Sequence, residues 1–156
     1  MGIMRGKLLL VFAVCAAAVM TMTPAFAGEA KITFNNKIDR DVYVVLCWAK
    51  YVSETEATMW KKGWYKVEPG KSRSFTLQGI KLTNDVGYYA ESASKNGQKL
   101  YWRGTSQNYA LLGGIHPTKS FDTDDCYIEG GMDVRFRQID LKRNGGNFTA
   151  TVNFSN

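Results

Sequence analysis

The chain is poor in the side chains that usually carry catalysis or hold metals. Of its 156 residues one is histidine, His116, and three are cysteine. A Ser-His-Asp apparatus needs a histidine base that a carboxylate holds within reach of a nucleophile, and no Gly-x-Ser-x-Gly motif accompanies His116. One histidine and so few cysteines also fall short of a zinc-ligand set. We therefore expect a protein that is not an enzyme, with no catalytic residue, no metal and no cofactor.

Acidic residues are few, and their spacing is uninformative. A cluster at Asp122, Asp124 and Asp125 is typical of a solvated turn, although closely spaced carboxylates could also form a weak site for a hard cation. Its glycine and glutamate spacing does not match an EF-hand. Glycoside cleavage needs two convergent carboxylates, and nothing in the sequence brings two glutamates or aspartates together.

Long hydrophobic runs are absent except at the start of the chain. There, residues 8–20 are apolar, two basic residues precede them, and the small-x-small triplet Ala25-Phe26-Ala27 follows. This pattern predicts a Sec-type signal peptide over residues 1–27, cleaved after Ala27. The run is too short and too alanine-rich for a stable membrane span. We expect residues 28–156 to form a single periplasmic or secreted domain with no transmembrane span.

The charge that remains after cleavage is mildly positive. Residues 1–27 carry two of the 20 basic residues and none of the 14 acidic ones, which leaves a formal net charge of +4 on 129 residues. Scattered charge of this size is typical of a solubilising surface, or of a shallow attraction to anionic lipid or glycan. Export argues against a nucleic-acid partner.

Two cysteines remain in the mature chain. Cys15 leaves with the signal peptide, whereas Cys47 and Cys126 stay. A disulfide between them is the default expectation in an exported protein, and it would stabilise the fold by about 4 kcal/mol in the chain-entropy picture. Two buried free thiols are the alternative, because cysteine also packs well as a small apolar side chain.

Alternation of apolar and polar residues predicts an all-β chain. Residues 42–48 are apolar on both faces, which indicates a central strand covered on both sides. Further alternating or turn-bounded segments lie at 31–34, 64–67, 73–77, 86–90, 99–103, 121–128, 134–136, 139–141 and 148–154. Many short strands with turn sequences between them predict one antiparallel β-sandwich, Ig-like in architecture, with at most one short helix.

Local motifs specify several of the connections. Pro69-Gly70 suits a type II turn at which two strands reverse, and Asn96-Gly97 suits a tight hairpin turn. Ser53 and Glu56 form a capping-box pattern, so a helix of up to two turns is expected from Ser53 to the glycine stop at position 63. Residues 105–118 lack periodicity and are expected to form an irregular loop. A bulge near 137–138 would reconcile the opposite phases of the segments on either side of it.

Aromatic residues are the richest group with functional potential. In the pairs Trp64-Tyr65 and Tyr101-Trp102, alternation sends one ring to each face of a strand. If the outward rings cluster beside basic side chains, they form a platform for sugars or for a partner's chain. The candidate binding surface comprises Trp64, Lys66, Arg73, Tyr101, Trp102 and Arg103. The competing interpretation is a core whose amphipathic rings are covered by Lys and Arg stems.

Several motifs in this order resemble a known family. They are Asn35-Asn36, Val42-Tyr43-Val44-Val45, Gly63-Trp64-Tyr65-Lys66-Val67-Glu68-Pro69-Gly70, Tyr88-Tyr89-Ala90, Trp102-Arg103-Gly104, Phe136-Arg137-Gln138-Ile139-Asp140-Leu141 and Phe148-Thr149. On these motifs the chain resembles the bacterial family of small exported proteins catalogued as domain of unknown function ten thirty-six. The resemblance covers most of the mature chain and implies architecture and export; it transfers no catalytic residue. Where family members often carry cysteine, this chain has Asn35 and Ser72.

The expected function is therefore that of an exported, non-catalytic β-sandwich domain, a binding or structural module of the bacterial cell envelope. Its partner would be an envelope component, a glycan or a protein. The alternative is a small secreted effector or membrane-active protein that acts through a basic, aromatic surface. Inhibition of a basic lysozyme is disfavoured, because the chain is itself positively charged.

Overall fold

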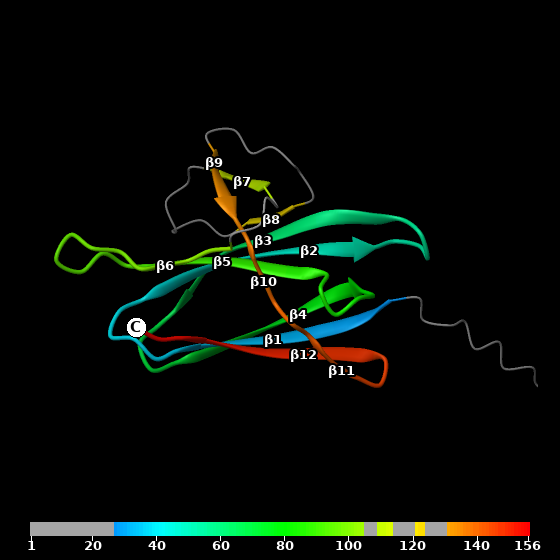
Figure 1. The fold of residues 1–156 in the computed structure, drawn as a ribbon, viewed down its shortest axis with the longest axis horizontal. Coiled ribbons are helices and arrows are strands. Elements are labelled where there is room, and N and C mark those ends of the chain that lie inside the picture. Colours follow the sequence, from blue (N-terminus) through cyan, green and yellow to red (C-terminus); the bar gives the residue numbers. More distant parts are fainter. Residues whose placement is uncertain (1–26, 105–108, 114–120, 124–130) are drawn as a thin grey trace, which may run out of the picture.

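The computed structural model describes residues 27–104, 109–113, 121–123 and 131–156, and the side chains of 27–104 and 134–156. The predicted signal peptide therefore lies outside the described residues, except for Ala27. The described residues form strands and turns and no helix, and two sheets pack face to face (Figure 1). The predicted all-β sandwich is confirmed. With no helix, the described residues also hold none with the length and apolarity that crossing a membrane requires.

The first sheet has the strand order β11-β12-β1-β4. Its strands are β1 (Gly28–Asn36), β4 (Ser72–Ile80), β11 (Lys142–Asn144) and β12 (Asn147–Phe154). β1 is antiparallel to β4 but parallel to β12, so one pairing departs from the antiparallel expectation. Every second residue of β12 from Phe148 to Phe154 faces the interior, as the alternation predicts.

The second sheet has the strand order β10-β5-β2-β3-β8, and β6 also pairs with β5. Its strands are β2 (Val42–Tyr51), β3 (Ala57–Val67), β5 (Val86–Ser92), β6 (Tyr101–Trp102), β8 (Phe121–Thr123) and β10 (Arg137–Gln138). β2 lies between β5 and β3, so the prediction of a central strand is confirmed.

A third, smaller layer covers part of the second sheet. β7 (Tyr109–Gly113) and β9 (Gly131–Arg135) pair with each other, and Figure 1 places them on the side of the second sheet that faces away from the first. The expectation of an irregular loop over 105–118 is therefore wrong at 109–113. The expected strand over 121–128 is present at 121–123 as β8, and its remainder lies outside the described residues.

The main core fills the space between the two sheets. Phe34 lies at its centre, stacked on Phe154 with ring centroids 5.6 Å apart and meeting Tyr88 edge-on, also at 5.6 Å. Such pairs add stability beyond the apolar area that they bury. The fully buried side chains around them include Ile32, Val42, Val44, Leu46, Leu77, Ile80 and Phe148.

A second apolar cluster, the outer cluster, lies on the opposite face of the second sheet. It consists of Val45, Cys47, Trp64, Tyr89, Val134 and Phe136. Val45 and Cys47 come from β2 and alternate with the residues that β2 contributes to the main core. The two-sided apolar pattern of 42–48 therefore reflects burial on both faces, as predicted.

The Pro69-Gly70 turn joins the two sheets. Gly70 has φ +68° and the Lys71 N–H donates to the Glu68 carbonyl over 3.0 Å, as in the predicted type II turn. The flanking strands do not pair with each other, because β3 pairs with β2 while β4 pairs with β1. The expectation of a hairpin is therefore wrong: the local turn is as predicted, but the chain changes layers there.

No helix forms after Ser53. The Ser53 hydroxyl accepts a hydrogen bond from the Glu56 N–H over 3.1 Å, as it would in a capping box. The Val52 N–H, however, donates to the Glu56 carbonyl over 3.0 Å, which closes a hairpin between β2 and β3. β3 then runs through the segment expected to be helical, so this expectation is wrong.

The phase change near 137–138 marks another change of layer. Phe136 packs in the outer cluster, whereas Ile139 packs in the main core. Between them β10 pairs with β5, and the chain then crosses to the first sheet at β11 (Figure 1). A crossing between layers, rather than a bulge within one strand, reconciles the two phases.

The tight turn at Asn96-Gly97 is confirmed. Both residues have positive φ, 53° and 76°, as a type I′ turn requires, and Lys95 and Gln98 exchange two backbone hydrogen bonds of 2.9 and 3.0 Å.

Candidate functional site

Strand register aligns four side chains across the outward face of the second sheet. Lys66 of β3 lies opposite Tyr43 of β2, Tyr43 lies opposite Glu91 of β5, and Glu91 lies opposite Tyr101 of β6. Directly opposed residues in antiparallel strands place their side chains on the same face, within contact distance. We call Lys66, Tyr43, Glu91 and Tyr101 the outer row.

The outer row ends in an exposed aromatic ring. Tyr101 is 50% exposed, and the Arg103 guanidinium lies 5.8 Å from its ring centroid. Tyr43, in the middle of the row, is half-buried and packs against the outer cluster. Two amphipathic rings flanked by cations can stack on a sugar or hold an extended chain by cation–π contacts.

Glu91 anchors the row electrostatically. Its side chain is 7% exposed, and it accepts hydrogen bonds from Lys99 Nζ over 2.8 Å and from the Tyr89 hydroxyl over 3.3 Å. The hydrogen bond to Glu91 is the main cause of the raised pKa of Lys99. The pKa of Tyr89 is also raised, chiefly by burial and to a smaller degree by the adjacent charge of Glu91. The Glu91 carboxylate therefore holds the side chains of Lys99 and Tyr89 in place.

Lys66 is exposed and shared between two carboxylates. Its Nζ lies 3.2 Å from Glu68 and 3.6 Å from Asp41, and the hydrogen bond with Glu68 is the main cause of the raised pKa of Lys66. Ion pairs as exposed as these contribute little to stability. The amine stays accessible to a partner.

The remaining predicted binding residues lie elsewhere. Trp64 is only 6% exposed and packs edge-on against Tyr89 at 5.8 Å, beneath the surface, and its indole N–H has no partner among the described residues. Trp102 turns to the inside, with its ring 4.8 Å from Phe154. Arg73 of β4 lies over the Tyr65 ring at 4.8 Å. Of the six candidates, Lys66, Tyr101 and Arg103 lie in or beside the outer row.

Sequence reasoning missed Tyr43, Glu91 and Lys99. Alternation along β2 puts Tyr43 on the outward face, but only the register shows that it meets Glu91 and Lys66. The association of Lys99 with Glu91 depends on the turn at Asn96-Gly97, which folds the chain back onto β5.

A basic trough lies where the two sheets part between β3 and β4. Lys50 Nζ sits 4.0 Å from the ring centroid of Trp60, and the Trp48 indole N–H donates to the Gln78 carbonyl over 3.2 Å. Lys62 and Thr76 complete the lining of a cavity of about 160 Å³. The basic trough is therefore Trp48, Lys50, Trp60, Lys62, Thr76 and Gln78.

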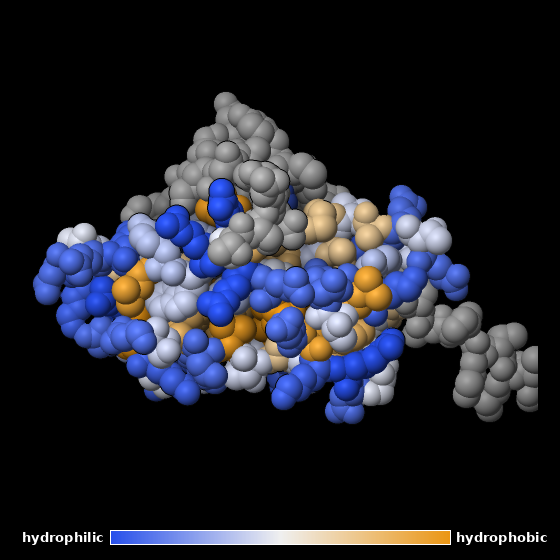
Figure 2. Space-filling model, in the orientation of Figure 1, coloured by the Kyte–Doolittle hydropathy of each residue, from blue (hydrophilic) through white to orange (hydrophobic). Residues whose placement is uncertain are grey.

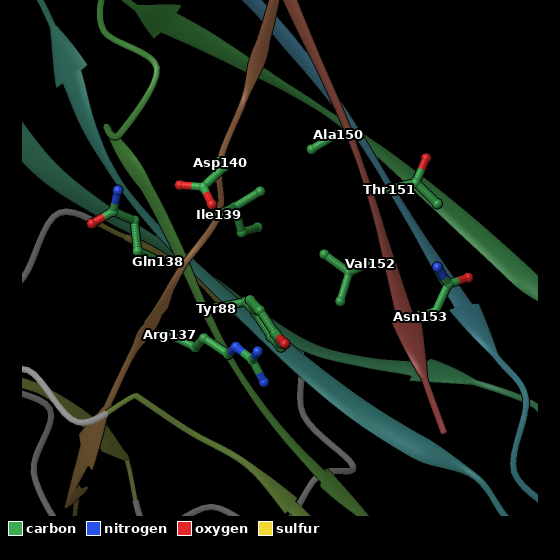
Figure 3. A pocket seen from close by; sticks show the side chains of 9 residues that line it. All are labelled: Tyr88, Arg137, Gln138, Ile139, Asp140, Ala150, Thr151, Val152 and Asn153. Carbon is green, nitrogen blue, oxygen red and sulfur yellow. The ribbon is translucent and has the colours of Figure 1, made fainter. Parts of the chain in front are cut away.

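A second cleft opens at the opposite edge of the sandwich, where β12 and the 137–141 segment diverge (Figure 3). Its volume is about 290 Å³, and Arg137 and Tyr88 lie side by side in it, with Val152 across from them. Burial raises the pKa of Tyr88, and the nearby Arg137 charge opposes that shift. On the face shown in Figure 2, hydrophobic residues appear along the seam between the sheets, within a largely hydrophilic surface.

The side chains that the sequence offers for catalysis are mostly outside the described part of the chain. His116 and Cys126 are among these, as are the side chains of Asp122, Asp124 and Asp125. In the part that is described, no three His, Cys, Asp or Glu side chains are grouped as metal ligands would be. Cys47 is buried in the outer cluster, and its disulfide with Cys126 remains a prediction.

No family model, no curated protein and no solved structure matches this chain.

Proposed function

We propose that the chain is an exported, non-catalytic β-sandwich domain that binds a component of the bacterial cell envelope, with the outer row as its contact surface. The observation that carries this proposal is the alignment of Lys66, Tyr43, Glu91 and Tyr101 in one row, with Arg103 beside it. An exposed ring beside a cation, here Tyr101 and Arg103, is typical of surfaces that bind glycans or partner chains.

The geometry of the titratable groups supports binding rather than catalysis. Glu91 is held by Lys99 and Tyr89, and Asp39 is paired with Lys95 and Arg40, so both carboxylates are engaged in holding loops and strands. A general acid or base has to face a substrate with a free proton or lone pair. Engaged pairs of this kind favour a structural role for these residues.

Export and family membership belong to the same proposal. β1 begins at Gly28, directly after the predicted cleavage position, and the Glu29 N–H donates to the Asn147 side chain over 3.2 Å. The first residues of the predicted mature chain are thus built into a sheet, which supports cleavage at Ala27. Membership of the family named above is proposed on the order of its motifs.

The test is co-sedimentation of residues 28–156 with purified insoluble peptidoglycan. We expect Tyr101→Ala combined with Arg103→Ala to reduce the bound fraction at least about fivefold, because the pair supplies the exposed ring and its cation. Arg143→Ala is the matched control, since Arg143 also lies over a ring, Phe148 at 5.5 Å, but in the first sheet. Equal binding by all three proteins would refute a role for the outer row.

The alternative is a secreted effector or membrane-active protein. Its support is the exposure of three apolar side chains, Val52 (54%), Met59 (46%) and Leu82 (49%), on a chain that is basic overall. Sedimentation with phosphatidylglycerol vesicles distinguishes it: binding at low salt that high salt abolishes would favour this alternative. Binding to peptidoglycan without vesicle binding would favour the first proposal.

A further inference from the structure

β4 is an edge strand of the first sheet. It pairs with β1 on one side, and no described strand pairs with its other side. Backbone groups in a strand point alternately to its two sides. Because Asn36 exchanges hydrogen bonds with Gly70 and Lys71, and Phe34 lies opposite Arg73, the residues of β4 that bond to β1 are Arg73, Phe75 and Leu77.

The alternate residues of β4 therefore direct their backbone to the open side. These are Ser72, Ser74, Thr76 and Gln78. The Gln78 carbonyl is consistent with this direction, because it accepts a hydrogen bond from the Trp48 indole N–H of the second sheet. Within the described part of the chain, no hydrogen bond occupies the N–H and C=O groups of Ser74 and Thr76. Donors and acceptors thus recur every second residue along this edge.

The charges beside this edge are predominantly positive. Lys50 and Lys62 line the basic trough next to Thr76, and Arg73 lies near the turn end of β4, where its guanidinium donates to the Lys66 carbonyl over 3.1 Å. The acidic residues nearby are Glu68 at the turn, Glu29, which is bonded to the Gln78 side chain, and Asp122 of β8, which lies opposite Lys62. Among the side chains that the structure describes, the charged groups beside the stretch between Glu68 and Glu29 are Lys50, Lys62 and Arg73.

We propose that the edge of β4 binds an extended acidic peptide segment of a partner protein, which adds to the first sheet as a further strand. Donors and acceptors at two-residue spacing match the backbone of a strand and not that of a glycan. Lys50 in the basic trough and Arg73 at the turn end of β4 would attract the carboxylates of the added strand. The site is separate from the outer row, so the proposal goes beyond the proposed function and can fail independently of it.

The same charges disfavour a second copy as the occupant. If two copies paired through β4, Lys50, Lys62 and Arg73 of each would approach their own counterparts, and like charges oppose edge-to-edge pairing. Analytical ultracentrifugation tests this point. A dimer in which the Ser74 and Thr76 amides become protected from exchange would overturn the peptide proposal.

The direct test uses a capped seven-residue peptide of alternating glutamate and threonine as the probe, titrated into residues 28–156 by NMR. Two N-methylated forms of the peptide are compared, one methylated at the odd residues and one at the even residues. Each form lacks the N–H groups on one side of the added strand, and only one of these sides faces β4. We expect one form to bind about tenfold more weakly than the unmodified peptide and the other to bind within about threefold. Equal affinity of the two N-methylated forms would show that the peptide binds by charge attraction alone, which would overturn the proposal. The absence of binding by the unmodified peptide would also overturn it.

Variants of the protein give a second readout. Thr76→Pro removes an edge N–H that the sheet does not use, and it should weaken probe binding about tenfold. Thr151→Pro is the matched control in β12 of the same sheet, at a position past the residues that β11 pairs with. Tyr101→Ala controls for the outer row, and both variants should bind the probe within about threefold of wild type. Probe binding by Thr76→Pro at wild-type affinity would overturn the proposal. If Thr76→Pro does not fold, the comparison of the N-methylated probes on the wild-type protein decides.

Discussion

At the scale of single residues, Asn36 links three strands of the sandwich, a role that no sequence motif predicted. Its buried side-chain amide donates to the carbonyls of Arg40 and Val67, each over 2.8 Å, and its carbonyl oxygen accepts from the Ile38 N–H over 3.1 Å. Its backbone N–H donates to the Lys71 carbonyl, and its backbone carbonyl accepts from the Gly70 N–H, each over 2.9 Å. One amide therefore fixes the corner where β1, β3 and β4 meet.

We predict that Asn36→Ala lowers the free energy of unfolding by about 3 kcal/mol, because it leaves two carbonyls and one N–H without their buried partner. Asn35→Ala is the matched control. Asn35 makes its hydrogen bonds at the surface, to Asn153 and Ser72, so its loss should cost less than about 1 kcal/mol. Urea denaturation measures both. Similar losses for the two variants would contradict the role given to Asn36.

Gly70 tests the turn between the sheets. Its φ of +68° lies in the left-handed region, and a Cβ would meet no other atom within 4 Å, so the effect of a side chain there is conformational. Gly70→Val should destabilise the fold by about 1 kcal/mol or more, whereas Gly70→Asn should cost less, because asparagine tolerates positive φ. An unchanged melting temperature for Gly70→Val would mean that the turn is of another type.

The cluster around Glu91 predicts loss of stability at alkaline pH. The pKa values of Tyr89 and Lys99 are both raised in the folded protein. A raised pKa means that the folded state keeps its proton longer than the unfolded chain does. The stability that these groups contribute is therefore fully present below about pH 10 and is lost as the pH rises through the folded pKa values.

Tyr89→Phe removes one of the two groups, so the decline of the unfolding free energy above about pH 10 should be shallower in this variant than in wild type. Urea denaturation at a series of pH values measures the two slopes. Parallel slopes would show that Tyr89 is not linked to folding.

At the scale of elements, the sequence predicts strands better than it predicts their partners. The sequence located β12 because exposed residues alternate with more buried ones along it, and it located β2 because residues between Val42 and Trp48 are buried on both faces. The prediction of a helix after Ser53 was wrong because its hydrogen-bond pattern is not specific to helices. A serine hydroxyl that accepts a hydrogen bond from the N–H three residues later occurs in tight turns as well as at the start of a helix. The Pro69-Gly70 turn was predicted correctly, but local geometry does not specify that β3 and β4 pair in different sheets.

The same limit applies to the candidate site. Tyr101 and Lys66 were predicted because alternation turns them outward, whereas Trp64 was placed at the surface although β7 and β9 lie over that side of the sheet. The outer row itself depends on the register of four strands, which no single segment of sequence encodes.

Register also bears on the predicted disulfide. Cys47 lies opposite Lys61, and Lys61 lies opposite Thr123, three positions before Cys126. Two strand spacings are about 10 Å, and three residues of extended chain span about as much. We predict a Cys47–Cys126 bond, detected as a cross-linked peptide by mass spectrometry without reduction, and a loss of up to about 4 kcal/mol on reduction. Two alkylatable thiols in the native exported protein would exclude the bond.

At the scale of the whole molecule, the chain leaves the second sheet after β6, contributes β8 to it between β7 and β9, and rejoins it at β10. The exit after β6 and the return before β10 adjoin, since the Gly104 N–H donates to the Arg135 carbonyl over 3.1 Å. A Cβ at position 104 would lie 2.1 Å from the Phe136 carbonyl oxygen, so this close approach requires glycine. The layer that carries β7 and β9 is thereby attached to one face of the second sheet. No strand among the described residues pairs with the outer side of β4 or of β11 in the first sheet.

Hydrogen exchange along β4 distinguishes an open edge of the sandwich from a covered one. In residues 28–156 we expect slow exchange for the amides of Phe75 and Leu77, which bond to β1, and fast exchange for Ser74 and Thr76, which face the open side. Equal protection of all four amides would show that another strand covers this edge, and the sandwich would then have no open edge at β4.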